Sequence, residues 1–199
     1  MDEIVLRSMA KWPKVPAVYD WLSLDRRGNW LIKGERIANT RIVEFINRNY
    51  DIDSAGNGFF QNGPQRVYVA LEYTPWIYLL PLRREPAGGR ERLLTHTGRE
   101  VADLQGVYLD ETGSLLLRSE HGVGQMDDRD LPALLPHFRD AAGQPLVEDL
   151  LLEALDATFP GSLGALRFLW NGRLLPIRRI EAKAVPRIFK FCPSPAAPS

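Results

Sequence analysis

Residues 21–50 read WLSLDRRGNWLIKGERIANTRIVEFINRNY, and this stretch predicts the building block of the fold. Two short runs of alternating apolar residues, Trp21–Leu24 and Trp30–Ile32, flank a polar break that ends in Gly28. A glycine in such a break supplies the positive φ that a tight turn needs, so the pattern predicts a β-hairpin. A helix is predicted next, because apolar residues recur at helical spacing between positions 42 and 50.

The same pattern returns later in the chain. Residues 107–138 read VYLDETGSLLLRSEHGVGQMDDRDLPALLPHF. Identical residues recur at an offset of 85 positions in four pairs: Asp25 and Asp110, Gly28 and Gly113, Leu31 and Leu116, Glu35 and Glu120. We interpret this repeat as a duplicated unit. The sequence therefore predicts an α+β protein of two similar small units, each a curved antiparallel sheet packed on a helix.

The predicted organisation has four parts. They are an N-terminal lead-in (1–17), a first α+β unit (18–85), a second α+β unit that repeats the hairpin-helix motif (86–192), and a disordered tail (193–199). The join falls in the charged stretch 83–92, which contains a proline and two adjacent glycines. An amphipathic helix is predicted over residues 145–159, and it has no counterpart in the first unit.

Composition excludes several classes of protein. The chain of 199 residues has 25 basic and 25 acidic side chains, so a general polyanion-binding role, including nucleic-acid binding, is not expected. A single cysteine, Cys192, cannot form an internal disulfide and favours a reducing cytoplasm. The acidic N-terminus does not resemble a signal peptide, and no apolar run is long enough to predict a membrane span. We expect a cytoplasmic protein without a membrane partner.

The first 80 residues carry a recognisable pattern. A turn followed by Gly28 and Trp30 leads to Gly34 and Ile37 before a helix with Phe45, and the strand that begins at Gln65-Arg66-Val67 ends in Glu72, Pro75 and Trp76. This pattern resembles the bacterial domain-of-unknown-function 1285 family. The resemblance implies an α+β fold of two domains built from similar motifs. It implies no established activity, only a part in regulation or signal transduction.

No catalytic, metal or cofactor motif is assembled in the sequence. The stretch Asp51–Gly56 begins like a calcium loop, but Ala55 and Asn62 stand where the loop needs oxygen ligands, so we interpret it as a turn. The three histidines lack the spacing of a zinc site, and no phosphate-binding loop or nucleophile elbow is present. We predict no catalytic residue, no metal and no cofactor.

Two stretches leave alternatives open. Glu120 and His121 stand beside glycines and could serve a metal-assisted enzyme, although neighbouring residues on a strand would face opposite ways. Residues 167–190 carry seven basic side chains against one acidic one. This basic segment either neutralises the acidic residues of its own unit or meets a phosphate, nucleic acid or acidic protein.

The sequence favours a non-catalytic module that binds a small molecule or a protein, with a regulatory role. We expect the ligand in a cleft between the two units. The predicted lining is Trp30, Arg66, Glu72 and Trp76, with Glu35 and Arg41 as further polar candidates. Strand edges on both units leave a dimer possible, and no motif specifies the oligomeric state.

Overall fold

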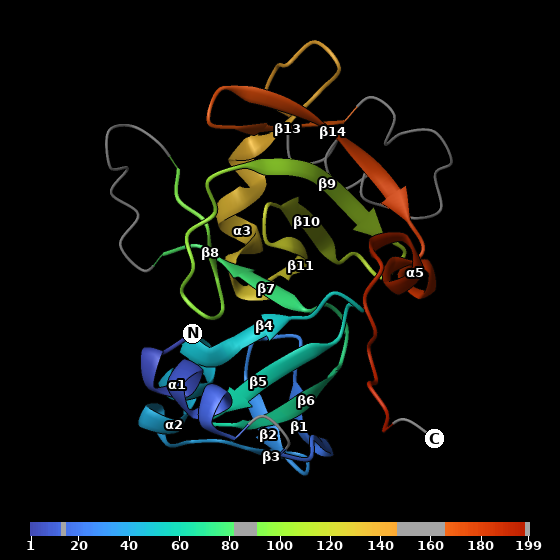
Figure 1. Ribbon diagram of the computed structural model, residues 1–199. Helices are drawn as coiled ribbons and strands as arrows, with labels where there is room; N and C mark the ends of the chain where they lie inside the picture. Colours follow the sequence, from blue (N-terminus) through green and yellow to red (C-terminus); the bar gives the residue numbers. More distant parts are fainter. Residues whose placement is uncertain (13–14, 82–90, 147–165, 198–199) are drawn as a thin grey trace. The chain divides into compact units, whose positions relative to one another are not determined.

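The computed structural model describes residues 1–12, 15–81, 91–146 and 166–197 (Figure 1). The chain divides into two compact units, which we describe separately. Unit 1 comprises Met1–Ile77, His96–Gly98 and Pro186–Ser199, and unit 2 comprises Tyr78–Thr95 and Arg99–Val185. In this division the chain passes into unit 2 at Tyr78, and its last residues belong to unit 1.

Unit 1 is a six-stranded sheet with helices. Its elements are α1 (Glu3–Lys11), β1 (Val18–Leu24), β2 (Trp30–Ile32), β3 (Glu35–Arg36), α2 (Thr40–Asn49), β4 (Tyr50–Ile52), β5 (Gly58–Asn62), β6 (Gln65–Leu71) and most of α5 (Val185–Phe189). The strand order is β3-β2-β1-β6-β5-β4. β1 and β6 are parallel, and the other neighbours are antiparallel.

Unit 2 contains most of an eight-stranded sheet. Its elements are β7 (Trp76–Leu79), β8 (Leu94–Thr95), β9 (Leu104–Asp110), β10 (Leu115–Ser119), β11 (Gly122–Met126), α3 (Leu131–Leu134) between two short 3₁₀ turns, β12 (Phe138–Arg139), β13 (Arg167–Trp170) and β14 (Arg173–Ile180). The strand order is β12-β13-β14-β9-β10-β11-β7-β8. β9 and β14 are parallel, as β1 and β6 are in unit 1.

The two sheets share one topology. Read from β11 to β12, unit 2 repeats the order of unit 1 from β3 to β4, with α3 in the place of α2 (Figure 1). The prediction of an α+β protein with two similar units is therefore confirmed. The sheets are mixed rather than purely antiparallel, because each connection through a helix and two strands returns the last strand parallel to the first.

The repeat in sequence is a repeat in strand register up to a defined point. Leu24 pairs with Trp30, and Leu109 pairs with Leu115, so the hairpins agree at the offset of 85. The agreement ends beyond Ile32, because β10 runs two residues further than β2 before it turns. Glu35 begins a strand, whereas Glu120 lies in a turn, so this fourth predicted pair is not a structural equivalent.

An aspartate carboxylate shapes four turns in the same way. In each turn one Oδ1 atom accepts hydrogen bonds from the backbone N–H groups two and four residues later, at 2.8–2.9 Å. A glycine with positive φ stands three residues after each aspartate. These turns begin at Asp25, Asp53, Asp110 and Asp140. The interpretation of the calcium-like stretch as a turn is confirmed by Asp53.

The helix that follows each hairpin is set by local chemistry. Asn39 caps α2 by accepting from the N–H groups of Arg41 and Ile42, and the helix runs for ten residues into β4. α3 has four residues, because Pro136 has no backbone N–H to continue the helix, whereas Pro132 lies in the first turn, where proline is tolerated. The helix predicted over residues 145–159 falls almost entirely outside the described residues.

The C-terminal segment packs on unit 1 instead of leaving it at Pro193. Leu71 donates its backbone N–H to the carbonyl of Pro193 at 2.7 Å, and Cys192 donates to Gly56 at 2.9 Å. A Cβ at Gly56 would lie 2.3 Å from the Lys190 carbonyl oxygen. Pro193, the first residue of the predicted tail, thus satisfies the backbone N–H at the end of β6.

Candidate functional site

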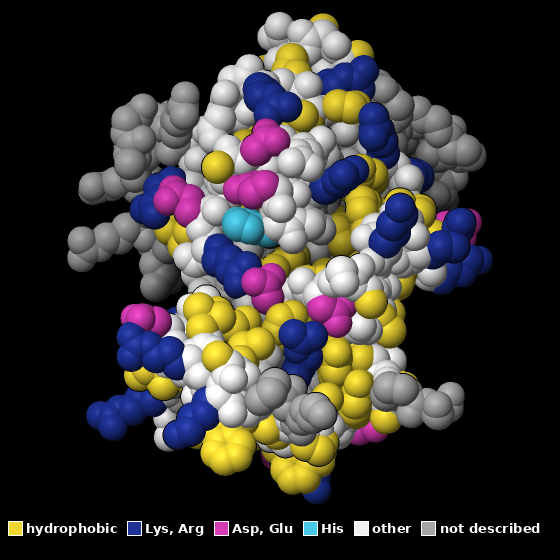
Figure 2. Space-filling view, viewed as in Figure 1, with side chains coloured by type: hydrophobic (Ala, Val, Ile, Leu, Met, Phe, Trp, Pro, Cys, Tyr) yellow, Lys and Arg dark blue, Asp and Glu magenta, His cyan; other side chains and the backbone are white. Residues whose placement is uncertain are grey.

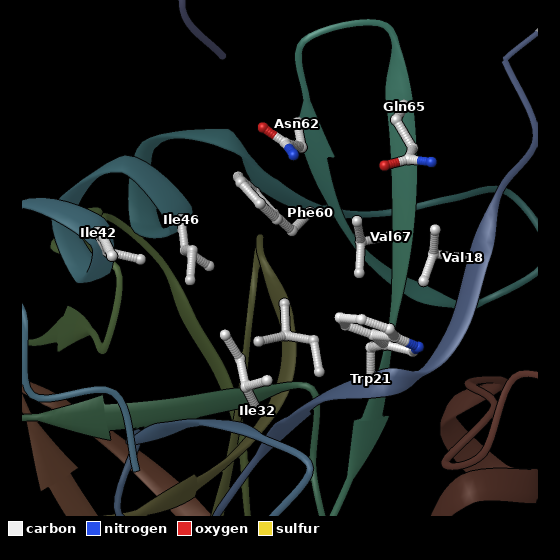
Figure 3. Close-up of a pocket in the computed structure, with 10 residues that line it drawn as sticks. Val18, Trp21, Ile32, Ile42, Ile46, Phe60, Asn62, Gln65 and Val67 are labelled. Carbon is white, nitrogen blue, oxygen red and sulfur yellow. The ribbon is translucent and has the colours of Figure 1, made fainter. Parts of the chain in front are cut away.

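A groove of about 320 Å³ opens in unit 1 between α2 and one face of the sheet (Figure 3). Its walls come from four strands and the helix, and most of them are apolar. The lining residues are Val18, Trp21, Leu22, Ile32, Ile42, Ile46, Phe60, Asn62, Gln65 and Val67. None of the described residues in this lining is charged.

The helix wall of the groove follows from how α2 packs. Phe45 meets Phe60 of β5 edge to face, with ring centroids 5.5 Å apart, and Ile46 is buried beside them. These contacts anchor the helix over β5. Ile42, one turn before Ile46 on the same side of the helix, lines the groove towards β1 and β2.

The strand wall is shaped by a bulge in β1. Val18 pairs with Val67, but the next pair in register is Leu22 with Val69, so β1 has two more residues here than β6. Asp20 takes up the irregularity with φ of +60°, a conformation that aspartate tolerates better than most residues. The bulge brings both Trp21 and Leu22 into the lining.

Three large apolar side chains form an exposed rim. The exposed fractions are 53% for Trp21, 43% for Ile32 and 46% for Ile42. The ammonium of Lys33 stands 4.5 Å from the centroid of the Trp21 ring, which limits how this indole turns. A single exposed apolar residue needs no explanation, but three around one groove mark a binding surface.

The polar groups of the groove lie together at one end, where β5 turns into β6. Asn62 closes β5 and Gln65 opens β6, and Figure 3 shows both carboxamides at the same end of the groove. Gln65 donates from Nε2 to the carbonyl of Pro16 at 3.3 Å. Its Oε1 atom is therefore the one available as an acceptor.

The residue of unit 2 that is equivalent to the exposed Ile32 is buried. Strand register makes Ile32 equivalent to Leu117, and Leu117 is buried. The sheet of unit 2 continues past β11 with β7 and β8, whereas the sheet of unit 1 ends at the two-residue strand β3. At the start of α3, Leu80 donates its N–H to Asp130 at 2.8 Å. Among the described residues, Ile32 is therefore exposed at the rim of the groove in unit 1, whereas its equivalent in unit 2 is buried.

The two tryptophans predicted to line the ligand site lie in the core of unit 1. Trp30 and Trp76 are both almost fully buried, and Tyr50 packs between them with centroid distances of 5.0 and 5.2 Å. His96 contacts both indoles at 5.3 and 5.8 Å. The indole N–H of Trp30 donates to Asn47 at 2.7 Å. The structure brings these two residues together as an aromatic cluster.

Two of the four polar candidates lie next to residues of the groove. Glu35 pairs with Ile32 across β2 and β3, and Arg41 precedes Ile42 in the first turn of α2. Both are exposed.

The other two polar candidates are used elsewhere in unit 1. The Arg66 guanidinium lies 4.0 Å from the Phe59 ring centroid and 3.9 Å from Asp53. Glu72 accepts from the backbone N–H of Arg26 at 3.2 Å. The six predicted residues do not converge on one site within unit 1.

Sequence reasoning missed most of the groove. Helical spacing predicts one apolar stripe that includes Ile42 and Ile46, but only Ile46 is buried. The alternating pattern predicts Trp21 in a regular strand, whereas its position depends on the bulge at Asp20. The bulge adds two residues to β1 relative to β6, and no pattern in the sequence signals it.

Glu120 and His121 occupy the turn between β10 and β11 rather than opposite faces of a strand. Glu120 accepts from the N–H groups of Ala102 and Asp103 at 2.6 and 3.2 Å, and His121 contacts the Glu100 carbonyl at 2.9 Å. Burial favours a raised pKa for Glu120, but these hydrogen bonds prevail and lower it. Both side chains thus hold residues 100–103. Within the described part of the chain no group of three metal-ligating side chains occurs.

Some basic side chains of residues 167–190 form ion pairs within unit 2, and others are exposed on its surface. Arg173 pairs with Asp103 at 2.8 Å, and Lys183 pairs with Glu181 at 3.2 Å, so part of the charge is neutralised within unit 2. Arg178 lies opposite Tyr108 on neighbouring strands and is exposed. Figure 2 shows Lys and Arg side chains spread over β9 and β14, while hydrophobic ones gather around β4–β6 of unit 1.

The described helices are all too short or too polar to cross a membrane.

Comparison with known proteins identifies a fold and a family. A crystal structure of a DUF1285 family protein from Silicibacter pomeroyi DSS-3 is 15% identical, with a TM-score of 0.53 over 84% of this chain and 85% of that chain. A DUF1285 family protein from Shewanella baltica OS155 is also 15% identical, with a TM-score of 0.42 over 56% of this chain and 87% of that chain. No curated protein matches the sequence.

The resemblance to the DUF1285 family is confirmed by the first of these structures at the level of the fold. Residues 1–196 match the model of a family described as a protein of unknown function (DUF2946). The chain belongs to the family of proteins of unknown function DUF2946.

Proposed function

We propose that this protein is a non-catalytic binding module whose ligand lies in the groove of unit 1. The observation that carries the proposal is the apolar groove of about 320 Å³ with Trp21, Ile32 and Ile42 exposed around it. Ile32 is exposed, whereas Leu117, its equivalent in unit 2, is buried. Ligand sites of this kind are concave, mostly apolar and supplied with a few polar groups, as this groove is.

We therefore propose the site in the groove within unit 1 instead of the cleft predicted between the units. Glu35 and Arg41 remain candidates, because each adjoins a rim residue. Trp30 lies two residues before Ile32 on β2, so both side chains are on the same face of the sheet, and its indole donates to Asn47 of α2. A change in either tryptophan of the cluster would act on folding rather than on ligand contact.

A regulatory or signal-transduction role in the cytoplasm is part of the same proposal. The resemblance to the DUF1285 family favours the role, and the single cysteine favours the compartment. A binding module regulates when its bound and free forms differ in affinity for a partner.

The test uses 1-octanol as a probe and two matched variants of the full chain. Ile42→Glu places a charge at the rim of the groove. Ile188→Glu places the same charge in α5, where Ile188 is exposed to 48% against 46% for Ile42. We expect saturable binding by calorimetry in the unchanged protein and in the Ile188 variant, and none in the Ile42 variant.

Chemical shifts would locate the probe. Binding should perturb the side-chain N–H signals of Trp21, Asn62 and Gln65 and leave that of Trp170, in unit 2, unchanged. The proposal is wrong if 1-octanol does not saturate, or if Ile42→Glu binds it as well as Ile188→Glu does.

A further inference from the structure

We infer that the ligand of the unit 1 groove is a small, uncharged amphiphile whose polar head forms hydrogen bonds with Asn62 and Gln65. This inference rests on the proposed function and names the chemical class of its ligand. Three observations lead to it: the volume of the groove, the chemistry of its two ends, and the direction of the Gln65 carboxamide.

The volume selects a small molecule over a protein segment. A groove of about 320 Å³ lies at the lower end of the range for small-molecule sites, roughly 300–1,000 Å³. It holds on the order of ten non-hydrogen atoms, taking ~30 Å³ for each water-sized group. A stable partner protein covers about 800 Å² of each surface, far more than this groove offers.

The wall chemistry selects an apolar body. Trp21 and Phe60 supply aromatic faces, and the remaining wall is branched aliphatic. Each methylene buried against such a wall strengthens binding about fourfold. The affinity of a homologous series should therefore rise with chain length and level off when the groove is full.

The polar end selects an uncharged head. Asn62 and Gln65 present carboxamides, and no charged side chain belongs to the described lining. An ionised head taken into this end would lose water without a charged partner. The ammonium of Lys33 stands over the Trp21 ring at the rim.

The direction of the Gln65 carboxamide favours a head that donates. Its Nε2 donates to Pro16, and Figure 3 shows Oε1 on the side of Asn62, where it can accept from a ligand. A carboxylate has no hydrogen to donate, whereas an amide or a hydroxyl has. A primary amide suits the pair best, because it can donate to Gln65 and accept from Asn62.

The experiment compares three probes with the same heptyl chain and different heads: octanamide, octanoate and heptylammonium. Binding to the full chain is measured by calorimetry at pH 7. We expect octanamide to bind about tenfold more tightly than either ion, the effect of one or two neutral hydrogen bonds. The double variant Asn62→Leu/Gln65→Leu should abolish this preference and still bind 1-octanol.

The outcomes separate the inference from the proposed function. Equal affinities for the three probes, or a preference for an ion, would overturn the uncharged head and leave the groove as a binding site. Persistence of the preference in the double variant would place the head elsewhere and overturn the inference too. If none of the three probes binds, and 1-octanol does not bind either, both statements fail. Gln105→Leu, an exposed glutamine of unit 2, is the matched control and should change no affinity.

Discussion

Replacing Asp110 by alanine tests whether the repeated Asp-turn-Gly unit holds the fold. The Asp110 residue is buried, and its Oδ1 atom accepts from the N–H groups of Thr112 and Ser114 at 2.9 Å each. The Thr112 hydroxyl donates to the same oxygen at 2.7 Å. Alanine removes the acceptor of all three bonds, while asparagine retains an Oδ1 atom at the same place.

The structure sets the size of the effect. A hydrogen bond contributes about 1 kcal/mol net to stability, and an N–H left without an acceptor costs at least as much. Losing three bonds should therefore lower the free energy of unfolding of unit 2 by about 2–4 kcal/mol. For a chain of this length that corresponds to a decrease in Tm of roughly 5–15 °C. Asp110→Asn should cost less than about 1 kcal/mol.

The assay compares the unfolding of the Asp110 variants of unit 2 with that of Asp25→Ala, the equivalent variant of unit 1. Urea unfolding followed by circular dichroism gives the free energies, and hydrogen exchange assigns the loss to β9 and β10 for Asp110 and to β1 and β2 for Asp25. Glu44→Ala, at an exposed position of α2, is the control and should stay within 0.5 kcal/mol, a typical surface effect. A loss below about 0.5 kcal/mol in Asp110→Ala, or an equal loss in Asp110→Asn, would refute the role of the turn carboxylate.

Three further variants test the aromatic core, the C-terminal segment and the stability of the protein at low pH. Trp30→Phe should lower stability by about 2–3 kcal/mol in urea, through lost packing and the lost bond to Asn47, with calorimetric 1-octanol affinity within twofold. Gly56→Ala should increase tryptic cleavage after Lys190, because its Cβ would collide with that carbonyl and its φ is +84°. Burial favours a raised pKa for Asp53, but hydrogen bonds from Asn57 and Ala55 prevail and lower it. The lowered pKa stabilises the folded state above pH ~4, and this contribution is lost as pH falls through the folded-state pKa. In Asp53→Asn, the free energy of unfolding should therefore depend less steeply on pH below pH ~4.

The duplicated architecture could be predicted because its signals are local. Asp25 and Gly28 specify a turn through their own backbone contacts, and Asp110 and Gly113 repeat them. A pattern of this kind survives in any context that keeps the hairpin. The parallel pairing of β1 with β6 could not be predicted in the same way, since it depends on where the chain returns after α2.

The candidate site was beyond sequence reasoning for a physical reason. Trp21, Trp30 and Trp76 are chemically identical, and composition gives each the same tendency to be buried. What separates them is the bulge at Asp20 and the edge at β3, which leave Trp21 exposed to 53%. Exposure of an aromatic residue is decided by what else covers the sheet, and this is a property of tertiary structure.

The difference between the two copies argues for a ligand. A groove lined by large apolar side chains costs stability unless something covers it, because each buried methylene contributes about 0.8 kcal/mol. Unit 2 extends its sheet beyond β11 with β7 and β8, and Leu117, the equivalent of Ile32, is buried there. Unit 1 ends instead at β3 and places Trp21, Ile32 and Ile42 around the opening. Under the proposed function, this apolar rim stays exposed in the free protein because the bound ligand is what covers it.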